Sequence, residues 1–272
     1  MTAINTNVGA LNARLYTLKA NQSQERAMER LSSGARINSA ADDAAGLAVA
    51  GKMESQLRGI NMSIRNAQDG VGLIQTAESG LNEIRNMVLR IRELAVQMAN
   101  GIYENTPDRS NAQLEVTALI DQVTLIAENT RFNDVAVLDG SFTGVTIQAG
   151  NTTSETITLS FVDMASSGLA IHAATIATQS DATVAMGTMD TALTTISQEQ
   201  AKFGSLINRL NYSIANQSNA SVMTEQAIGR VMDADFAAET TDLSKQQILN
   251  QAATSMLAQA NQSKQSILAL LQ

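Results

Sequence analysis

Apolar side chains recur every three or four residues over an unusually long stretch, from about residue 44 to residue 100. This spacing predicts one face of an α-helix, and it is out of phase only once, between Ile74 and Ile84. Such a helix would be about 85 Å long. It needs partner helices of similar length, as in a coiled coil with a local stammer. The periodic positions are Met53, Leu57, Ile60, Ile64, Ala67, Val71, Ile74, Leu81, Ile84, Val88, Ile91, Ala95 and Met98.

The helical spacing returns on both sides of this stretch. Thr106 and Pro107 predict the N-cap and first residue of a helix over 107–129, and a further periodic segment covers 186–231. Near the chain ends, breaks rich in small and acidic residues separate two more amphipathic segments. Gly34 predicts a helix end, and Asp42 or Asp43 a new start. The terminal stripes comprise Ile4, Val8, Leu11, Leu15 and Leu18, and Leu249, Ala252, Met256, Ala260, Ile267 and Leu270.

In the middle of the chain the spacing changes from helical to alternating. Val145 and Ile147, and then Ile157, Leu159 and Phe161, recur every second residue. Turn sequences rich in Gly, Asn and Asp flank these runs. The pattern predicts a β-hairpin or small sheet.

Together the segments predict a mainly α fold. We expect a long antiparallel helical bundle or coiled-coil rod, with a small β-hairpin element inserted mid-chain and the N- and C-terminal helices paired. Each terminal stripe must pack on the opposite end of the chain or on another molecule, which indicates self-assembly. The expected domains are a terminal helix with hinge (1–43), N-terminal rod helices (44–131), the β element with a connector (132–180), a C-terminal rod helix (181–232) and a second terminal helix (233–272).

Composition excludes several functional classes. The net charge is −8, and aromatic residues make up 3% of the chain, which argues against a nucleic-acid binder. There is no cysteine and one histidine, His172, so we expect no metal site, no cofactor and no enzymatic activity. No run approaches 18 apolar residues, so we expect no membrane span. Residues 46–52 fit a phosphate-binding loop except that Met53 stands where Ser or Thr is needed.

Two pairs of carboxylates lie near the breaks between the periodic segments. Asp42 and Asp43, and Asp233 with Asp235, could be described as metal ligands. Because each pair precedes a periodic segment, helix capping is the favoured interpretation.

Several strings resemble bacterial flagellins. They are INTNVGALNA near the start, LSSGARINSAADDAAGLAVA over 31–50, NAQDGVGLIQTAESGLNEI over 66–84, RIRELAVQMAN over 90–100, and the final DADFAAETTDLSKQQILNQAATSMLAQANQSKQSILALLQ. The resemblance covers nearly the whole chain. It implies a structural subunit that polymerises into the extracellular flagellar filament for motility, in a short form without the variable outer domains.

The resemblance also implies partners and an export route. Flagellins are secreted unfolded through the flagellar type III apparatus, and their terminal segments are disordered in the monomer and fold on assembly. Expected partners are further copies of the chain, the flagellar cap and hook-junction proteins, and an export chaperone. Toll-like receptor 5 is a further expected partner, through the segment holding Arg90, Arg92, Glu93, Leu94 and Gln97; Leu89 replaces the usual Gln there, which we expect to weaken recognition.

Two alternatives share the helical patterning. A flagellin-like hook–filament junction protein has similar terminal helices but matches the central motifs less well. A coiled-coil signalling module of chemoreceptor type would lack the mid-chain β element and would follow a membrane span. Both alternatives therefore rank below the filament subunit.

Overall fold

The computed structural model describes residues 6–269, with the side chains of residues 6–264. The chain divides into two compact units. Unit 1 is formed by Met1–Leu57 and Val222–Gln272, and unit 2 by Arg58–Ser221.

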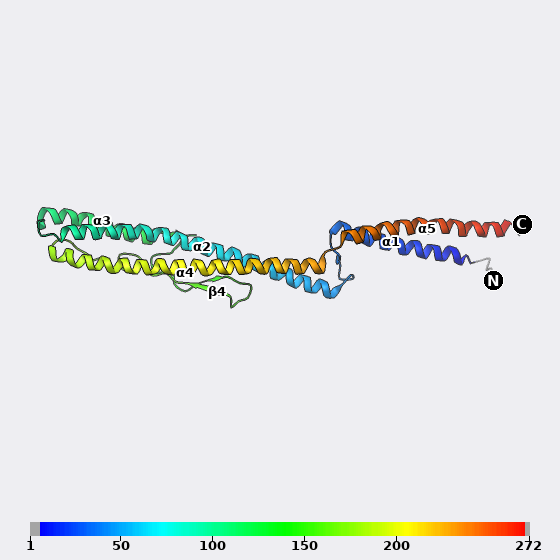
Figure 1. Cartoon of the computed structure of the whole chain (residues 1–272), viewed down its shortest axis with the longest axis horizontal. Helices are drawn as coiled ribbons and strands as arrows, with labels where there is room; N and C mark the ends of the chain where they lie inside the picture. Colours follow the sequence, from blue (N-terminus) through cyan, green and yellow to red (C-terminus); the bar gives the residue numbers. More distant parts are fainter. Residues whose placement is uncertain (1–5, 270–272) are drawn as a thin grey trace. The chain divides into compact units, whose positions relative to one another are not determined.

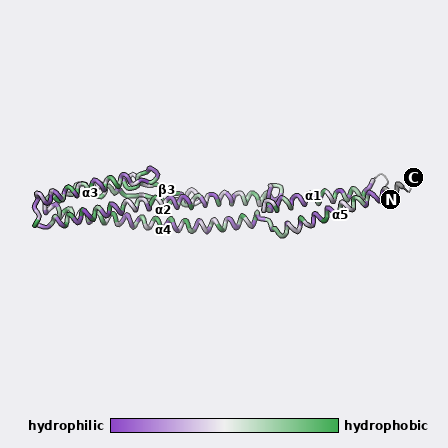
Figure 2. The backbone as a smooth tube through the Cα atoms, turned by 90° about the horizontal axis from the view of Figure 1, so that it is seen from above, coloured by the Kyte–Doolittle hydropathy of each residue, from purple (hydrophilic) through white to green (hydrophobic). Residues whose placement is uncertain are grey.

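Unit 2 is built on three helices that lie side by side (Figure 1): α3 (Ser110–Asn129), the part of α2 (Ala44–Met98) from Arg58 onward, and the part of α4 (Gln179–Met232) up to Ser221. Hydrophobic and hydrophilic residues alternate along each of them (Figure 2). The apolar stripe predicted for α2 faces the core, and α2 is continuous through the out-of-phase step. The fully buried side chains of the core include Ile74, Leu81, Ile84, Val88 and Ile91 of α2, Val116 and Val123 of α3, and Met189, Ile196, Phe203 and Leu210 of α4.

The predicted hairpin is confirmed. β3 (Val145–Gln148) pairs antiparallel with β4 (Thr156–Leu159), in the register that places Val145 opposite Leu159. Ile157 and Leu159 face the core, and the following Phe161 lies in a row of rings, 4.9 Å from Phe142 and 4.7 Å from Phe203 between centroids. A second, shorter antiparallel pair, β1 (Arg131–Phe132) with β2 (Val135–Ala136), was not predicted.

The turn between α2 and α3 corrects the predicted start of α3. Thr106 has extended backbone angles (φ −134°, ψ 124°), and α3 begins at Ser110 after the five-residue helical turn η1 (Asn105–Arg109). The side chain of Arg109 holds this turn. It is 4% exposed, and its guanidinium donates to the carbonyl oxygens of Met98 (2.9 Å) and Asn100 (2.9 Å). The spacing predicted a break between these helices but not the Arg109 bonds that close it, because they join residues about ten apart.

In unit 1, α1 (Val8–Ser33) pairs with α5 (Phe236–Ala269) in antiparallel orientation (Figure 1). Predicted boundaries are confirmed here. Gly34 ends α1 in a left-handed conformation (φ 71°), with its N–H donating to the Arg30 carbonyl at 2.9 Å. Asp43 accepts from Gly46 N at 2.9 Å, and Asp235 accepts from Ala237 N at 2.9 Å, so both carboxylates cap helices.

Within the described range of 6–269, none of the helices is long and apolar enough to cross a membrane. The same residues contain no cluster of three or more His, Cys, Asp or Glu that could hold a metal ion.

Candidate assembly interface

α1 and α5 meet along a row of positions that we call the seam. The buried and half-buried residues of each helix recur in steps of three and four, which is the heptad spacing of a coiled coil. Most of the α1 side chains in the seam are small or polar. The seam consists of Ala10, Ala13, Thr17, Ala20, Gln24, Ala27 and Leu31 on α1, and Leu243, Gln246, Asn250, Ala253, Leu257, Ala260 and Lys264 on α5.

Apart from the half-buried Leu31, Leu243 and Leu257, many large apolar side chains of the two helices lie outside the seam and are exposed. They include most of the stripes predicted for assembly, and we call the following set the outer apolar residues: Val8 (58% exposed), Leu11 (52%), Leu15 (57%) and Leu18 (51%) on α1, and Leu249 (47%) and Met256 (64%) on α5. Of the other predicted assembly residues, Ile4 and Leu270 lie outside the described residues, and Ile267 belongs to α5 but its side chain is not described.

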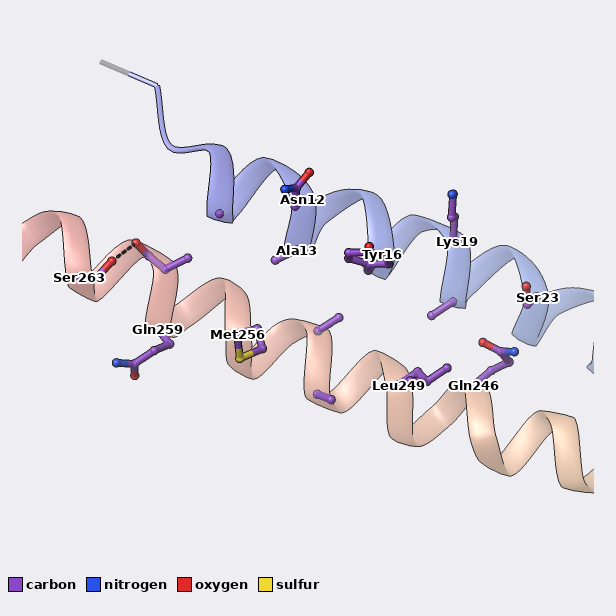
Figure 3. A pocket seen from close by; sticks show the side chains of 15 residues that line it. Asn12, Ala13, Tyr16, Lys19, Ser23, Gln246, Leu249, Met256, Gln259 and Ser263 are labelled. Carbon is purple, nitrogen blue, oxygen red and sulfur yellow. Dashed lines mark hydrogen bonds between the residues drawn. The ribbon is translucent and has the colours of Figure 1, made fainter. Parts of the chain in front are cut away.

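Some outer apolar residues border a groove of about 660 Å³ along the helix pair. Figure 3 shows its lining: Tyr16 and Ala13 come from α1, and Leu249 and Met256 from α5. Lys19 points away from α5, so the groove has an apolar floor and a polar rim. Tyr16 is 67% exposed and was not among the predicted assembly residues, because it directly follows Leu15 and so falls outside the spacing of three and four.

The seam leaves most of the hydrophobic free energy of these helices unrealised. Burying a Leu or Met side chain stabilises by about 1.5–3 kcal/mol, whereas a single methyl group contributes about 0.8 kcal/mol. The fully buried seam residues are Ala13, Ala20, Ala27 and Ala253. Leu11, Leu15 and Leu18 recur at helical spacing on one exposed face of α1, and such an apolar face is typical of a protein–protein contact.

The predicted receptor segment lies on α2 in unit 2. Arg90 and Glu93 are exposed, and Arg90 forms ion pairs with Glu115 of α3 (2.9 Å) and Glu93 (3.4 Å). The hydrogen bond to Glu115 raises the pKa of the Arg90 guanidinium above its ordinary value. Arg92 pairs with Asp190 of α4 at 2.6 Å, and this contact likewise raises its pKa.

The last two residues of that segment differ in exposure. Gln97 is exposed and donates to the Tyr103 hydroxyl at 3.3 Å. Leu94 is 4% exposed and belongs to the core. The segment therefore presents charged and amide groups at the surface, tied to α3, to α4 and to the α2–α3 turn.

Both halves of the chain match models of a known protein family. Residues 4–143 match the bacterial flagellin N-terminal helical region, and residues 186–271 match the bacterial flagellin C-terminal helical region. The chain belongs to the bacterial flagellin family. It is 41% identical to a flagellin of Halalkalibacterium halodurans over 273 residues, covering 98% of this chain and 99% of that one. It is 40% identical to the flagellar filament 33 kDa core protein of Treponema phagedenis over 284 residues, with the same coverage of 98% and 99%.

Among solved structures, the crystal structure of Bacillus cereus flagellin is 32% identical, with a TM-score of 0.51, over 56% of this chain and 88% of that chain. A putative flagellar hook-associated protein from Vibrio parahaemolyticus, 12% identical, aligns with a TM-score of 0.60 over 71% of this chain and 100% of that one. At that identity the second likeness shows a shared fold and nothing about function.

These findings confirm the predicted function. The flagellin is a structural, non-enzymatic subunit that assembles into the extracellular bacterial flagellar filament for motility. The short form without variable outer domains is confirmed too, because the alignment with the H. halodurans flagellin spans 99% of that protein in 273 residues.

Proposed function

We propose that flagellin subunits polymerise through the outer apolar residues of α1 and α5. The observation that carries this proposal is the difference between two faces of α1: Ala13, Ala20 and Ala27 are buried against α5, whereas Leu11, Leu15 and Leu18 are exposed. A second subunit can bury these leucines, and head-to-tail contacts that do not close produce an open helical filament. The proposed contact set is Ile4, Val8, Leu11, Leu15, Leu18, Leu249, Met256, Ile267 and Leu270.

Each predicted segment would then occupy its own layer of the filament. Residues 1–43 and 233–272 form the inner filament core and its hinges. Residues 44–131 and 181–232 form the surrounding rod layer, and 132–180 covers it. The division of the chain into a unit made from both ends and a unit made from the middle supports this arrangement.

Paired substitutions on α1 test the polymerisation surface. In Leu11→Ser with Leu15→Ser, both side chains are more than half exposed in the single chain, so the helical content of the monomer should hardly change. Loss of two buried leucines from the subunit contact should raise the critical concentration for seeded filament growth by about 100-fold. Growth would be followed by light scattering and negative-stain microscopy.

The matched control keeps the apolar surface. Leu11→Met with Leu15→Met should assemble within a few-fold of the parent chain, because methionine has a similar volume and hydrophobicity. Equal assembly of the Ser and Met variants would contradict a contact through this face.

For export, we propose secretion through the flagellar type III apparatus, with an export chaperone before secretion and the cap and hook-junction proteins as partners at the growing filament. Family membership supports this route. The intact mass of filament protein checks it, because cleavage of an N-terminal leader would contradict this route.

For host recognition, we propose that Arg90, Arg92, Glu93, Leu94 and Gln97 contribute to a contact with Toll-like receptor 5 that Leu89 weakens. The exposure of Arg90, Glu93 and Gln97 supports a surface role, and Leu94 would act by packing beneath them. Leu89→Gln should lower the concentration needed for half-maximal signalling in receptor-expressing reporter cells. Leu114→Gln on α3 is the control, and equal signalling by the parent and Leu89→Gln would contradict the weakening.

A further inference from the structure

The repeated alanines of the seam do not by themselves determine the axial position of α1 along α5. Ala13, Ala20 and Ala27 are seven residues apart, so a shift of α1 by seven residues, about 10.5 Å, returns an alanine to two of these three seam positions. α5 has 34 residues and α1 has 26, so a shift toward the C-terminal end of α5 keeps the whole of α1 opposite helix. Packing of alanines therefore selects the register only weakly.

Polar contacts between the two helices do distinguish the registers. The amide of Asn250 in the seam donates to the side-chain oxygen of the exposed Asn21, about halfway along α1. Near the end of α1, the Arg30 guanidinium lies 3.1 Å from the Glu239 carboxylate, and the Glu239 side chain is only 14% exposed. At the other end, the Asn7 amide donates to the Ala260 carbonyl at 3.0 Å.

The shifted register would break the two side-chain pairs. Seven residues along, Asn250 would face Met28, which offers no comparable hydrogen bond. Arg30 would face Gln246, and Glu239 would lie beyond the end of α1 without its guanidinium. A half-buried carboxylate and amide left without partners are costly, and a polar residue in a coiled-coil seam is a known means of fixing register.

We propose that Asn21, Arg30, Glu239 and Asn250 determine the register of α1 on α5, and that the alanines supply close packing without register. The consequence for assembly rests on the proposed function. A shifted register would move Leu249 and Met256 about 10.5 Å along α1 and change which α1 residues lie opposite them in the groove of Figure 3, so the surface offered to a second subunit would change.

Disulfide trapping tests the register directly, because the chain has no cysteine of its own. A Cβ at Gly9 would lie 3.6 Å from Ala260 Cβ, within the disulfide range, so Gly9→Cys with Ala260→Cys reports the native register. Gly9→Cys with Ile267→Cys, one heptad further, reports the shifted register. Both pairs are placed in the full chain, as soluble subunit and as filament, and oxidised product of monomer mass is counted as intramolecular.

In the parent chain the native pair should cross-link and the shifted pair should not. In the quadruple variant Asn21→Leu, Arg30→Ala, Glu239→Ala and Asn250→Leu, the ratio of shifted to native cross-link should rise about tenfold or more, which corresponds to about 1.4 kcal/mol of lost register preference. The neighbouring exposed pair Gln22→Leu with Gln251→Leu adds the same apolar surface outside the seam and should leave the ratio unchanged.

Three results would overturn the proposal. One is an unchanged ratio in the quadruple variant, which would assign the register to the backbone hydrogen bonds from Arg36 N to the Met232 carbonyl (2.6 Å) and from Ala234 N to the Gly34 carbonyl (3.0 Å). Another is an equal rise in the exposed control, and the last is failure of the native pair to cross-link in both forms of the parent chain. The proposed polymerisation surface fails separately, through normal growth of the Leu11→Ser, Leu15→Ser variant, so the two ideas are distinguishable.

Discussion

At the scale of single residues, glycines inside the helices of unit 2 serve different purposes. A Cβ at Gly80 of α2 would lie 2.6 Å from the Thr130 hydroxyl oxygen and 3.0 Å from Leu138 Cδ1. The Thr130 hydroxyl is held by its bond to the Ile126 carbonyl at 2.6 Å, so it cannot easily move. Gly204 of α4, in contrast, has no atom within 4 Å of such a Cβ.

Alanine substitution should therefore change stability in opposite directions at these two glycines. Gly80→Ala should lower the free energy of unfolding by about 1–3 kcal/mol through overpacking. Gly204→Ala should raise it by up to about 1 kcal/mol, because alanine has the higher helix propensity. Denaturant unfolding of the monomer measures both, and a shift of the same sign in the two variants would contradict the assigned role of Gly80.

Sequence reasoning succeeded at residues whose partners are close along the chain. Gly34 and Asp43 were predicted as helix boundaries because a left-handed cap and an N-cap act within four residues. Gly80 and Arg109 were missed. Gly80 is required by Thr130, fifty residues away, and Arg109 is required by carbonyl groups whose turn becomes visible only when the fold is known.

At the scale of elements, the break between α1 and α2 is organised by one carboxylate. Asp42 accepts from Ser39 N at 3.0 Å, from the Ser39 hydroxyl at 2.9 Å and from Asn38 N at 3.3 Å. The hydrogen bonds from Ser39 lower the pKa of Asp42 below its ordinary value of 3.8. A lowered pKa in the folded state means that this contribution to stability is present above the unfolded-state pKa and is lost as the pH falls through the folded-state value.

The break should therefore loosen only in strong acid. The amide proton shift of Ser39, followed by NMR, should titrate with a midpoint below 3.8, and the titration should vanish in Asp42→Asn. A midpoint at or above 3.8 in the parent chain would show that the Ser39 bonds are not formed in solution.

Periodicity predicted which helices exist but not what each helix face contacts. The apolar stripe of α2 and the stripe of α1 have the same spacing, yet the first is buried in unit 2 and the second is exposed on unit 1. The difference comes from the opposite face of α1, where Ala13, Ala20 and Ala27 allow close approach of α5. The β1–β2 pair was missed for another reason, since two-residue strands are too short to show an alternating pattern.

At the scale of the whole molecule, the two units differ in what they bury. The buried hydrophobic residues of unit 2 include large side chains such as Phe203, Met189 and Leu81, whereas those described in unit 1 are alanines apart from Ile37. Since the hydrophobic contribution scales with the apolar area buried, unit 2 should be far more stable in the free subunit. A chain without residues 1–35 and 236–272 should therefore keep its cooperative unfolding transition and lose the ability to form filaments.

Hydrogen exchange on the full chain would measure the difference in stability between the two units and show which helices cause it. In the free subunit, amides of the α2 and α4 segments within unit 2 should exchange slowly and those of α1 and α5 quickly, because alanine packing alone resists local opening poorly. In the filament, protection should rise most at α1 and α5, since burial of Leu11, Leu15, Leu249 and Met256 by neighbouring subunits would supply the apolar area that the single chain lacks. Slow exchange of α1 and α5 already in the free subunit would mean that the seam is stable alone, and the leucines of the outer face would then need another explanation.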